Sequence, residues 1–210
     1  MSEETTEKAP QEAEQNLLVA NDIYLKAGIH IGTKFKTKDM KKFIYKTRND
    51  GLSDLNLEVI DERIKLTANF LANYAPEEIL FVSRREGSFK ALKLMKKLVG
   101  FNAFAGRYPP GVLTNPALEN FIEPRVVVVS DPWADQSTVK DTTLAGITLL
   151  GFCDTNNLVN DLDLILPCNN KGKKSLGLIY YLLTREYMIK RGMIKNAEEF
   201  SASIEDFTEE

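Results

Sequence analysis

Two aspartates follow predicted strands, at positions where a carboxylate can do chemistry. Asp131 follows a strand predicted at residues 125–129, and Asp154 follows one predicted at residues 147–152. Because ligands of open α/β sheets bind at the carboxyl ends of the strands, the two acids could hold a hydrated Mg²⁺ ion or act as an acid/base pair. We interpret them as structural, Asp131 capping the turn before a helix and Asp154 making an Asx-turn, because no further catalytic residue accompanies them. The alternative is a Mg²⁺-dependent enzyme acting on a phosphorylated substrate.

The other candidate nucleophiles and metal ligands are few. The single histidine, His30, cannot form a multi-histidine metal site, and nothing signals a nucleophile that it could activate as a base. The two cysteines, Cys153 and Cys168, are too few for a disulfide framework and lack metal-ligand spacing. We therefore predict no catalytic residue and no metal, and a structural role for His30.

Two glycine-containing loops fall short of a nucleotide-binding motif. A dinucleotide site needs Gly-x-Gly-x-x-Gly after the first strand, whereas residues 83–88 contain one glycine. The run Gly172-Lys-Lys-Ser175 has the end of a phosphate-binding loop, but Pro167 stands where the first glycine belongs and Lys174 where Ser or Thr belongs. We therefore predict no cofactor and no small-molecule substrate.

The basic residues are better organised than the acids, and they form five clusters. These are Lys34, Lys36, Lys38, Lys41, Lys42, Lys46 and Arg48; Arg84 and Arg85; Lys90, Lys93 and Lys97; Arg107 with Tyr108; and Lys171, Lys173 and Lys174. Any one cluster is explained by a solvated surface, but five in one basic domain favour a polyanion as partner. The expected mode is phosphate contact and shape recognition on folded RNA, which tolerates sequence change and weakens with salt.

Apolar runs alternate with helical patterns and predict the scaffold that carries these residues. Strands are expected at residues 79–82, 102–105, 125–129, 147–152 and 162–166, and helices at residues 58–74, 87–99, 135–145 and 175–187. Upstream, a short helix at residues 17–26 precedes a hairpin of residues 43–46 and 52–55 around Asp50-Gly51. The pattern predicts an α/β fold, a three-layer αβα domain with a parallel sheet and a small N-terminal helix and hairpin appendage.

Charge divides the chain into a basic body and two acidic ends. The chain of 210 residues has a formal net charge of -3, of which residues 1–16 carry -4, residues 197–210 carry -6 and residues 17–196 carry +7. We expect a domain at residues 17–196 flanked by a disordered tail at residues 1–16 and an acidic, disordered C-terminal tail at residues 197–210. Alternatively, Phe200 and Phe207 anchor the C-terminal tail to a partner, or both acidic tails dock basic partners. No run is long and apolar enough to span a membrane and no targeting signal stands at the N-terminus, which predicts a soluble cytoplasmic protein.

Several motifs resemble a known family. They include Tyr24-Leu-Lys-Ala-Gly-Ile-His-Ile-Gly-Thr33, Gly106-Arg-Tyr-Pro-Pro-Gly-Val-Leu-Thr-Asn-Pro116, Asp131-Pro-Trp-Ala-Asp135, Cys153-Asp-Thr-Asn-Asn157 and Asn169-Asn-Lys-Gly-Lys-Lys-Ser175. Over about residues 17–192 the chain resembles the archaeal and eukaryotic branch of the second protein of the small ribosomal subunit. The resemblance implies a flavodoxin-like or Rossmann-like αβα domain without catalysis. It also implies binding to small-subunit ribosomal RNA and contacts with neighbouring ribosomal proteins in the cytoplasmic small subunit. The five basic clusters are then the expected RNA contacts.

Overall fold

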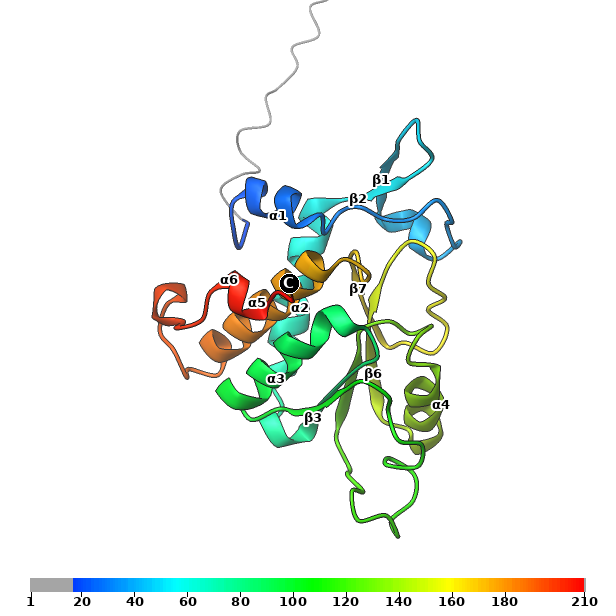
Figure 1. Cartoon of the computed structure of the whole chain (residues 1–210), viewed down its shortest axis with the longest axis vertical. Coiled ribbons are helices and arrows are strands. Elements are labelled where there is room, and N and C mark those ends of the chain that lie inside the picture. The colour runs from blue at the N-terminus through cyan, green and yellow to red at the C-terminus, as the bar shows by residue number, and fades with distance from the viewer. Residues whose placement is uncertain (1–16, 210) are drawn as a thin grey trace, which may run out of the picture.

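Parallel strands form a sheet at the centre of the chain, in a computed structural model that describes residues 17–209 (Figure 1). The strands are β1 (Ile44–Thr47), β2 (Ser53–Leu55), β3 (Ile79–Ser83), β4 (Asn102–Ala105), β5 (Val126–Val129), β6 (Thr148–Cys153) and β7 (Leu164–Pro167). The helices are α1 (Asn21–Ala27), α2 (Leu57–Leu71), α3 (Phe89–Leu98), α4 (Gln136–Ala145), α5 (Lys173–Lys190) and α6 (Ile204–Phe207). Short 3₁₀ turns occupy Met40–Phe43, Pro76–Glu78, Glu86–Ser88 and Ala197–Glu199.

The large sheet has the order β4-β3-β5-β6-β7, and every neighbouring pair is parallel. Its central strands β3 and β5 are buried on both faces, as their continuous apolar sequences predicted. In β3, Ile79 and Phe81 join the core on one face of the sheet, whereas Leu80 and Val82 join the core on the other face. Alternate side chains of the strand therefore contribute to two separate hydrophobic cores, one on each face of the sheet.

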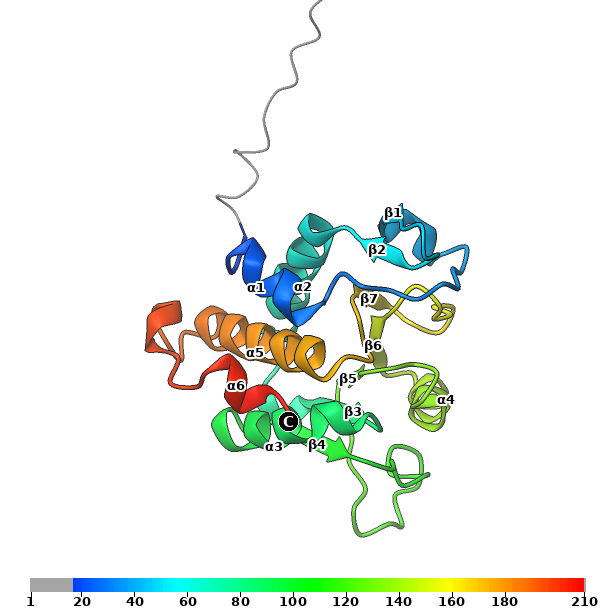
Figure 2. The ribbon, with the colours of Figure 1, turned by 45° about the horizontal axis from the view of Figure 1, so that its top comes forward.

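Helices cover the two faces unequally. The helices α2, α3 and α5 lie on one face, and α4 lies on the other (Figure 2). On the α4 side the remaining cover comes from the loop between β4 and β5, whose Tyr108, Val112 and Leu113 are buried in the second core. The predicted three-layer αβα fold is confirmed. Among residues 17–209, no helix combines the length and apolar character that a membrane crossing requires.

The connections create a reversal in the strand order. The chain runs from β3 through α3 to the edge strand β4, and then returns to place β5 on the opposite side of β3. At such a point the loops that follow the two central strands diverge, and they leave a crevice at the carboxyl ends of the strands. Arg84 and Arg85 follow β3 at this crevice, and Asp131 follows β5.

The N-terminal appendage matches the predicted helix and hairpin, and specific contacts tie it to the domain. Strands β1 and β2 are antiparallel, and α1 ends at Gly28, whose φ of +67° is the left-handed conformation of a helix C-cap. Helix α1 begins at Asn21, later than expected, because the backbone N–H of Leu18 donates to the Asp61 carboxylate of α2 at 2.9 Å instead. The Tyr24 hydroxyl also donates to Asp61, at 2.6 Å.

The C-terminal segment differs from the expectation. Phe207 is fully buried, its ring 5.8 Å from that of Tyr181, and Phe200 lies 5.3 Å from the same ring. The backbone passes so close to α5 that a Cβ atom on Gly177 would lie 3.0 Å from the Phe207 carbonyl oxygen. The predicted disorder is therefore wrong for residues 197–209, because their two phenylalanines anchor on the chain itself. The tail predicted at residues 1–16 lies outside the described residues.

A core role for the C-terminal segment predicts a large effect of one substitution. Phe207→Ala should lower the free energy of unfolding by roughly 3–5 kcal/mol, because it leaves a cavity beside Tyr181. Urea denaturation measures the change. The control is Leu144→Ala, at a side chain 80% exposed on α4, which should change that free energy by less than about 0.5 kcal/mol. If both variants unfold alike, the segment does not belong to the cooperative unit.

Candidate nucleic-acid interface

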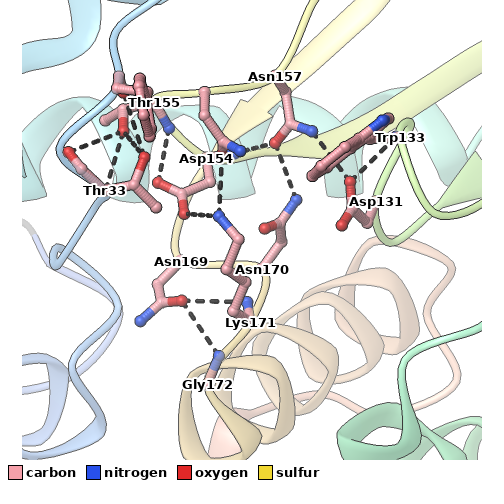
Figure 3. Close-up of polar contacts among 12 residues, drawn as sticks. Thr33, Asp131, Trp133, Asp154, Thr155, Asn157, Asn169, Asn170, Lys171 and Gly172 are labelled. Atoms are coloured by element: carbon pink, nitrogen blue, oxygen red, sulfur yellow. Dashed lines mark hydrogen bonds and ion pairs between the residues drawn. The ribbon is translucent and has the colours of Figure 1, made fainter.

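Asp131 is buried at the crevice between β3 and β5, and both of its carboxylate oxygens have partners. Oδ2 accepts from two N–H groups of the Arg85 guanidinium, with Nε at 3.1 Å and Nη2 closer. Oδ1 accepts from the Trp133 backbone N–H at 3.0 Å and from Asn157 Nδ2 at 2.9 Å (Figure 3). The acceptance from Trp133 confirms the predicted turn before α4, and Arg85 neutralises the charge.

Asp154, also buried, has a separate cationic partner. Its Oδ2 lies 2.7 Å from Lys171 Nζ, and its Oδ1 accepts from the Thr155 backbone N–H at 2.6 Å (Figure 3). We expected an Asx-turn here, but the side chain binds the adjacent amide and the lysine instead. Asn157 joins the two acids, because its Nδ2 donates to Asp131 while its Oδ1 accepts from the Asp154 backbone N–H at 2.8 Å.

This arrangement suits structure better than Mg²⁺ catalysis. Each carboxylate already has a positively charged partner, so a cation would have to displace Arg85 or Lys171. Within residues 17–209 no three His, Cys, Asp or Glu side chains form a group that could hold a metal ion. The Mg²⁺-dependent enzyme is therefore not supported by the geometry of Asp131 and Asp154.

The histidine and the cysteines are placed for packing. His30 Nε2 lies 3.4 Å from Arg48 Nη2, and burial lowers the pKa of the imidazole, which favours its neutral form. Cys153 and Cys168 are completely buried, and burial raises the pKa of both thiols. Thiols that stay protonated and inaccessible are not nucleophiles.

Asp135, which the sequence did not single out, is the acid with the most perturbed titration. It is 4% exposed, and its Oδ1 accepts from the Arg84 backbone N–H at 3.0 Å. Burial, assisted by the nearby Asp131 charge, raises the pKa of Asp135 to about 7. No sequence signal distinguishes this residue from an ordinary helix-capping aspartate.

The basic residues predicted to contact RNA divide by what their side chains touch. Arg48 pairs with Asp54 at 2.7 Å, Arg85 with Asp131 and Lys171 with Asp154, although all three side chains stay about one-third exposed, at 36%, 33% and 34%. The Lys90 Nζ donates to the backbone carbonyls of Glu205 and Thr208 at 3.0 Å each, so its charge is bound to the C-terminal segment although the residue is exposed. The other basic residues of the clusters are exposed: Lys34, Lys36, Lys38, Lys41, Lys42, Lys46, Arg84, Lys93, Lys97, Arg107, Lys173 and Lys174.

Tyr108, which was predicted to contact RNA, is buried. Its side chain is 5% exposed, and its hydroxyl donates to Asp141 at 3.1 Å and accepts from the Leu113 backbone N–H. Tyr108 therefore holds the loop on α4, while the adjacent Arg107 points its charge to solvent.

The fold brings the clusters together at the carboxyl edge of the sheet. The loop before α5 touches the N-terminal segment, since the Asn169 backbone N–H donates to the Ile29 carbonyl at 2.8 Å. It also touches the turn after β3, where a Cβ atom on Gly87 would lie 3.0 Å from the Cα of Lys173. The loop after β4 joins them through the Gly106 N–H, which donates to the Ser83 carbonyl at 2.8 Å. Loops that carry clusters far apart in sequence thus meet at this edge, whereas Lys93 and Lys97 continue along α3.

Adjacent arginines provide a matched pair of variants. Arg85→Ala should lower the free energy of unfolding by about 2 kcal/mol, because it leaves the buried Asp131 without its cation. Arg84→Ala removes an exposed guanidinium and should change that free energy by less than about 0.5 kcal/mol. Urea denaturation of both variants measures the difference, and equal stabilities would show that the Arg85–Asp131 pair does not hold the crevice.

The raised pKa of Asp135 predicts a pH-dependent stability. From about pH 4 to about pH 7 the folded chain keeps a proton on Asp135 that the unfolded chain has lost, so stability falls as the pH rises through this window. Asp135→Asn should remove this contribution, and its stability relative to the parent should rise by up to about 1.4 kcal/mol per pH unit. Urea denaturation between pH 5 and pH 8 tests it, and parallel profiles for the two proteins would contradict it.

The comparisons with known proteins agree with the motifs. The family model described as Ribosomal protein S2 matches residues 24–122 and 119–189. The small ribosomal subunit protein uS2 of Methanococcus maripaludis (strain C5) is 48% identical over 197 residues, which cover 94% of this chain and 89% of that protein. The proteins of the same name from Nanoarchaeum equitans and Picrophilus torridus are 46% identical over 190 residues and 44% identical over 194 residues. They are covered to 94% and 97% of their own lengths, by 90% and 92% of this chain.

These matches run through the segments whose motifs suggested the relationship, including the loop after β4 and the polar loops around Asp131 and Asp154. The resemblance inferred from the sequence is thereby confirmed, and the chain belongs to the ribosomal protein S2 family.

Proposed function

We propose that the chain is a structural constituent of the small ribosomal subunit that binds small-subunit ribosomal RNA and supports subunit assembly and translation in the cytoplasm. The observation that carries the proposal is the gathering of basic clusters at the carboxyl edge of the sheet. Lysine and arginine side chains that neutralise phosphates supply most of the affinity for folded RNA. The relatives bear the name of a small ribosomal subunit protein.

The clusters take different parts in this interface. The lysines of the N-terminal segment, together with Arg84, Arg107 and Lys174, present exposed charges to phosphates. Arg48, Arg85 and Lys171 hold buried carboxylates and offer only their exposed third to RNA. Lys93 and Lys97 extend the basic surface along α3, Lys90 binds the C-terminal segment, and the buried Tyr108 supports the surface from within.

Contacts with neighbouring ribosomal proteins form the second part of the proposal. A member of an assembled particle meets other proteins, and the acidic ends of the chain are suited to basic neighbours. Residues 1–16, with a net charge of -4, are the segment we assign to such contacts. The chain would then act as a domain on which the C-terminal segment packs through Phe207, with a further acidic segment at residues 1–16.

Co-sedimentation with ribosomal particles tests the function. The full chain, carrying an epitope tag, is expected to travel with the small subunit in a sucrose gradient at low salt. It should be released in part as salt rises, because phosphate contacts are screened and counterions compete. Free protein at the top of the gradient at every salt concentration would contradict the ribosomal assignment.

A charge reversal in the N-terminal segment tests the contact surface. Lys41→Glu with Lys42→Glu should weaken incorporation into the subunit, because two phosphate partners become repulsive. The thermal midpoint should fall by no more than about 2 °C, since the exposed contact of Lys42 Nζ with the Phe43 ring is worth about 0.5 kcal/mol. Quantitative gradients and thermal melts measure the two effects.

The matched control places the same charge change elsewhere. Lys140 and Lys190 are exposed on α4 and at the end of α5, outside the five clusters. Lys140→Glu with Lys190→Glu should leave incorporation close to that of the parent. Equal losses in the two double variants would mean that net charge, and not the N-terminal cluster, governs incorporation.

A further inference from the structure

A cleft at the carboxyl edge of the sheet lies beside the basic edge and has no role so far. Its volume is about 570 Å³, and it is lined by the loop between β5 and α4, the loop between β6 and β7, and the N-terminal segment at Phe35. Ligand clefts for small molecules and single residues have volumes of roughly 300–1,000 Å³. The cleft is therefore large enough for one nucleotide.

The lining includes two strongly exposed aromatic rings. Phe35 is 80% exposed and Trp133 is 72% exposed, and Leu158 beside them is 69% exposed. Large apolar side chains that gather on one surface mark an interaction site rather than an accident of composition. Each ring offers a face to which another planar group could stack.

Hydrogen bonds hold the backbone beneath both rings. On the two sides of Phe35, the Thr33 N–H donates to Thr155 Oγ1 at 2.9 Å and the Thr37 N–H donates to the Thr155 carbonyl at 2.9 Å. The Trp133 N–H donates to the buried Asp131 carboxylate (Figure 3). The rings are thus exposed from ordered segments, so that little conformational entropy remains to be lost when a ligand binds.

We propose that this cleft binds an unstacked base of single-stranded RNA, with the Phe35 and Trp133 rings as stacking partners. The proposal rests on the proposed function and deepens it, because it adds recognition of an unpaired base to phosphate contacts. Single-stranded RNA is bound by aromatic faces together with basic groups that follow its backbone.

The polar groups around the rings fit this occupant. Gln136, Asn156 and Asn160 line the cleft, and their amides can pair with the edges of a base. Asp161, which also lines it, can accept from an exocyclic amino group. Lys34, Lys36 and Lys38 flank Phe35 and are exposed, in reach of the phosphates on either side of a bound nucleotide.

Trp133 is the only tryptophan of the chain, so its fluorescence reports on the cleft directly. The full chain is titrated with single-stranded oligoadenylate of ten nucleotides and, separately, with a fully paired RNA hairpin. We expect saturable quenching of the emission by oligoadenylate, because stacked bases quench indole, and little quenching by the hairpin. Fluorescence anisotropy of end-labelled RNA measures total binding in the same samples.

Phe35→Ala tests the second ring without touching the reporter. It should weaken oligoadenylate binding about 5-fold to 100-fold, the range for loss of one base–aromatic stack. The control, Leu144→Ala, alters an equally exposed apolar side chain on α4 outside the cleft and should bind as the parent does. Because Phe35 is exposed, its replacement should leave the thermal midpoint unchanged.

Three results would overturn the proposal. The first is RNA binding seen by anisotropy with unchanged Trp133 emission and an unaffected Phe35→Ala variant, which leaves the proposed function standing. The second is normal RNA affinity of Phe35→Ala and Trp133→Leu together with loss of co-sedimentation with the small subunit, which assigns the cleft to a protein neighbour. The third is absence of RNA binding by both readouts at low salt, which removes the proposed function as well.

Discussion

A carboxylate buried where a sheet reverses its strand order needs partners for both oxygens, and Asp131 obtains them from three different loops. Arg85 comes from the turn after β3, Trp133 from the turn after β5, and Asn157 from the loop after β6. An unpaired charge at this depth would cost several kcal/mol, so the three loops are constrained to one arrangement. The positions of the basic clusters that leave these loops follow from that constraint.

The same constraint explains why a fold that elsewhere binds nucleotides offers no nucleotide site here. A phosphate bound after β3 would need free backbone N–H groups at the start of the following helix. In this chain the Arg84 N–H donates to Asp135, the Arg85 N–H to the Ser83 hydroxyl and the Lys90 N–H to the Glu209 carboxylate. The chain's own acids and hydroxyls thus accept the N–H groups that a phosphate would need. The exposed basic side chains lie outside this position, on the surface.

Local patterns predicted the elements, and long-range contacts account for what they missed. Continuous apolar runs such as residues 126–129 and helical spacing identified the strands and helices, because both signals depend on near neighbours in sequence. The Arg85–Asp131 pair joins residues 46 positions apart, and no spacing rule reveals it. The disorder expected near Phe207 failed for a related reason: composition counts the six acids of residues 197–210 but not the space beside Gly177 and Tyr181 into which the ring fits. Five basic clusters were visible in the sequence, whereas their convergence depends on the topology.

A basic surface that binds RNA also carries like charges that repel one another. In this fold, the cations that are paired with acids differ from the exposed cations that are available to RNA. Like charges on one edge repel and destabilise the folded state, most strongly where they are least solvated. Among the clustered cations of this edge, the partly buried Arg85 and Lys171 are paired with buried acids, whereas the lysines of the N-terminal segment extend into water that screens them. The C-terminal segment adds acidic groups beside Lys90 on α3. Because pairing within the fold offsets the inner charges, the outer ones are available to phosphate without loss of stability.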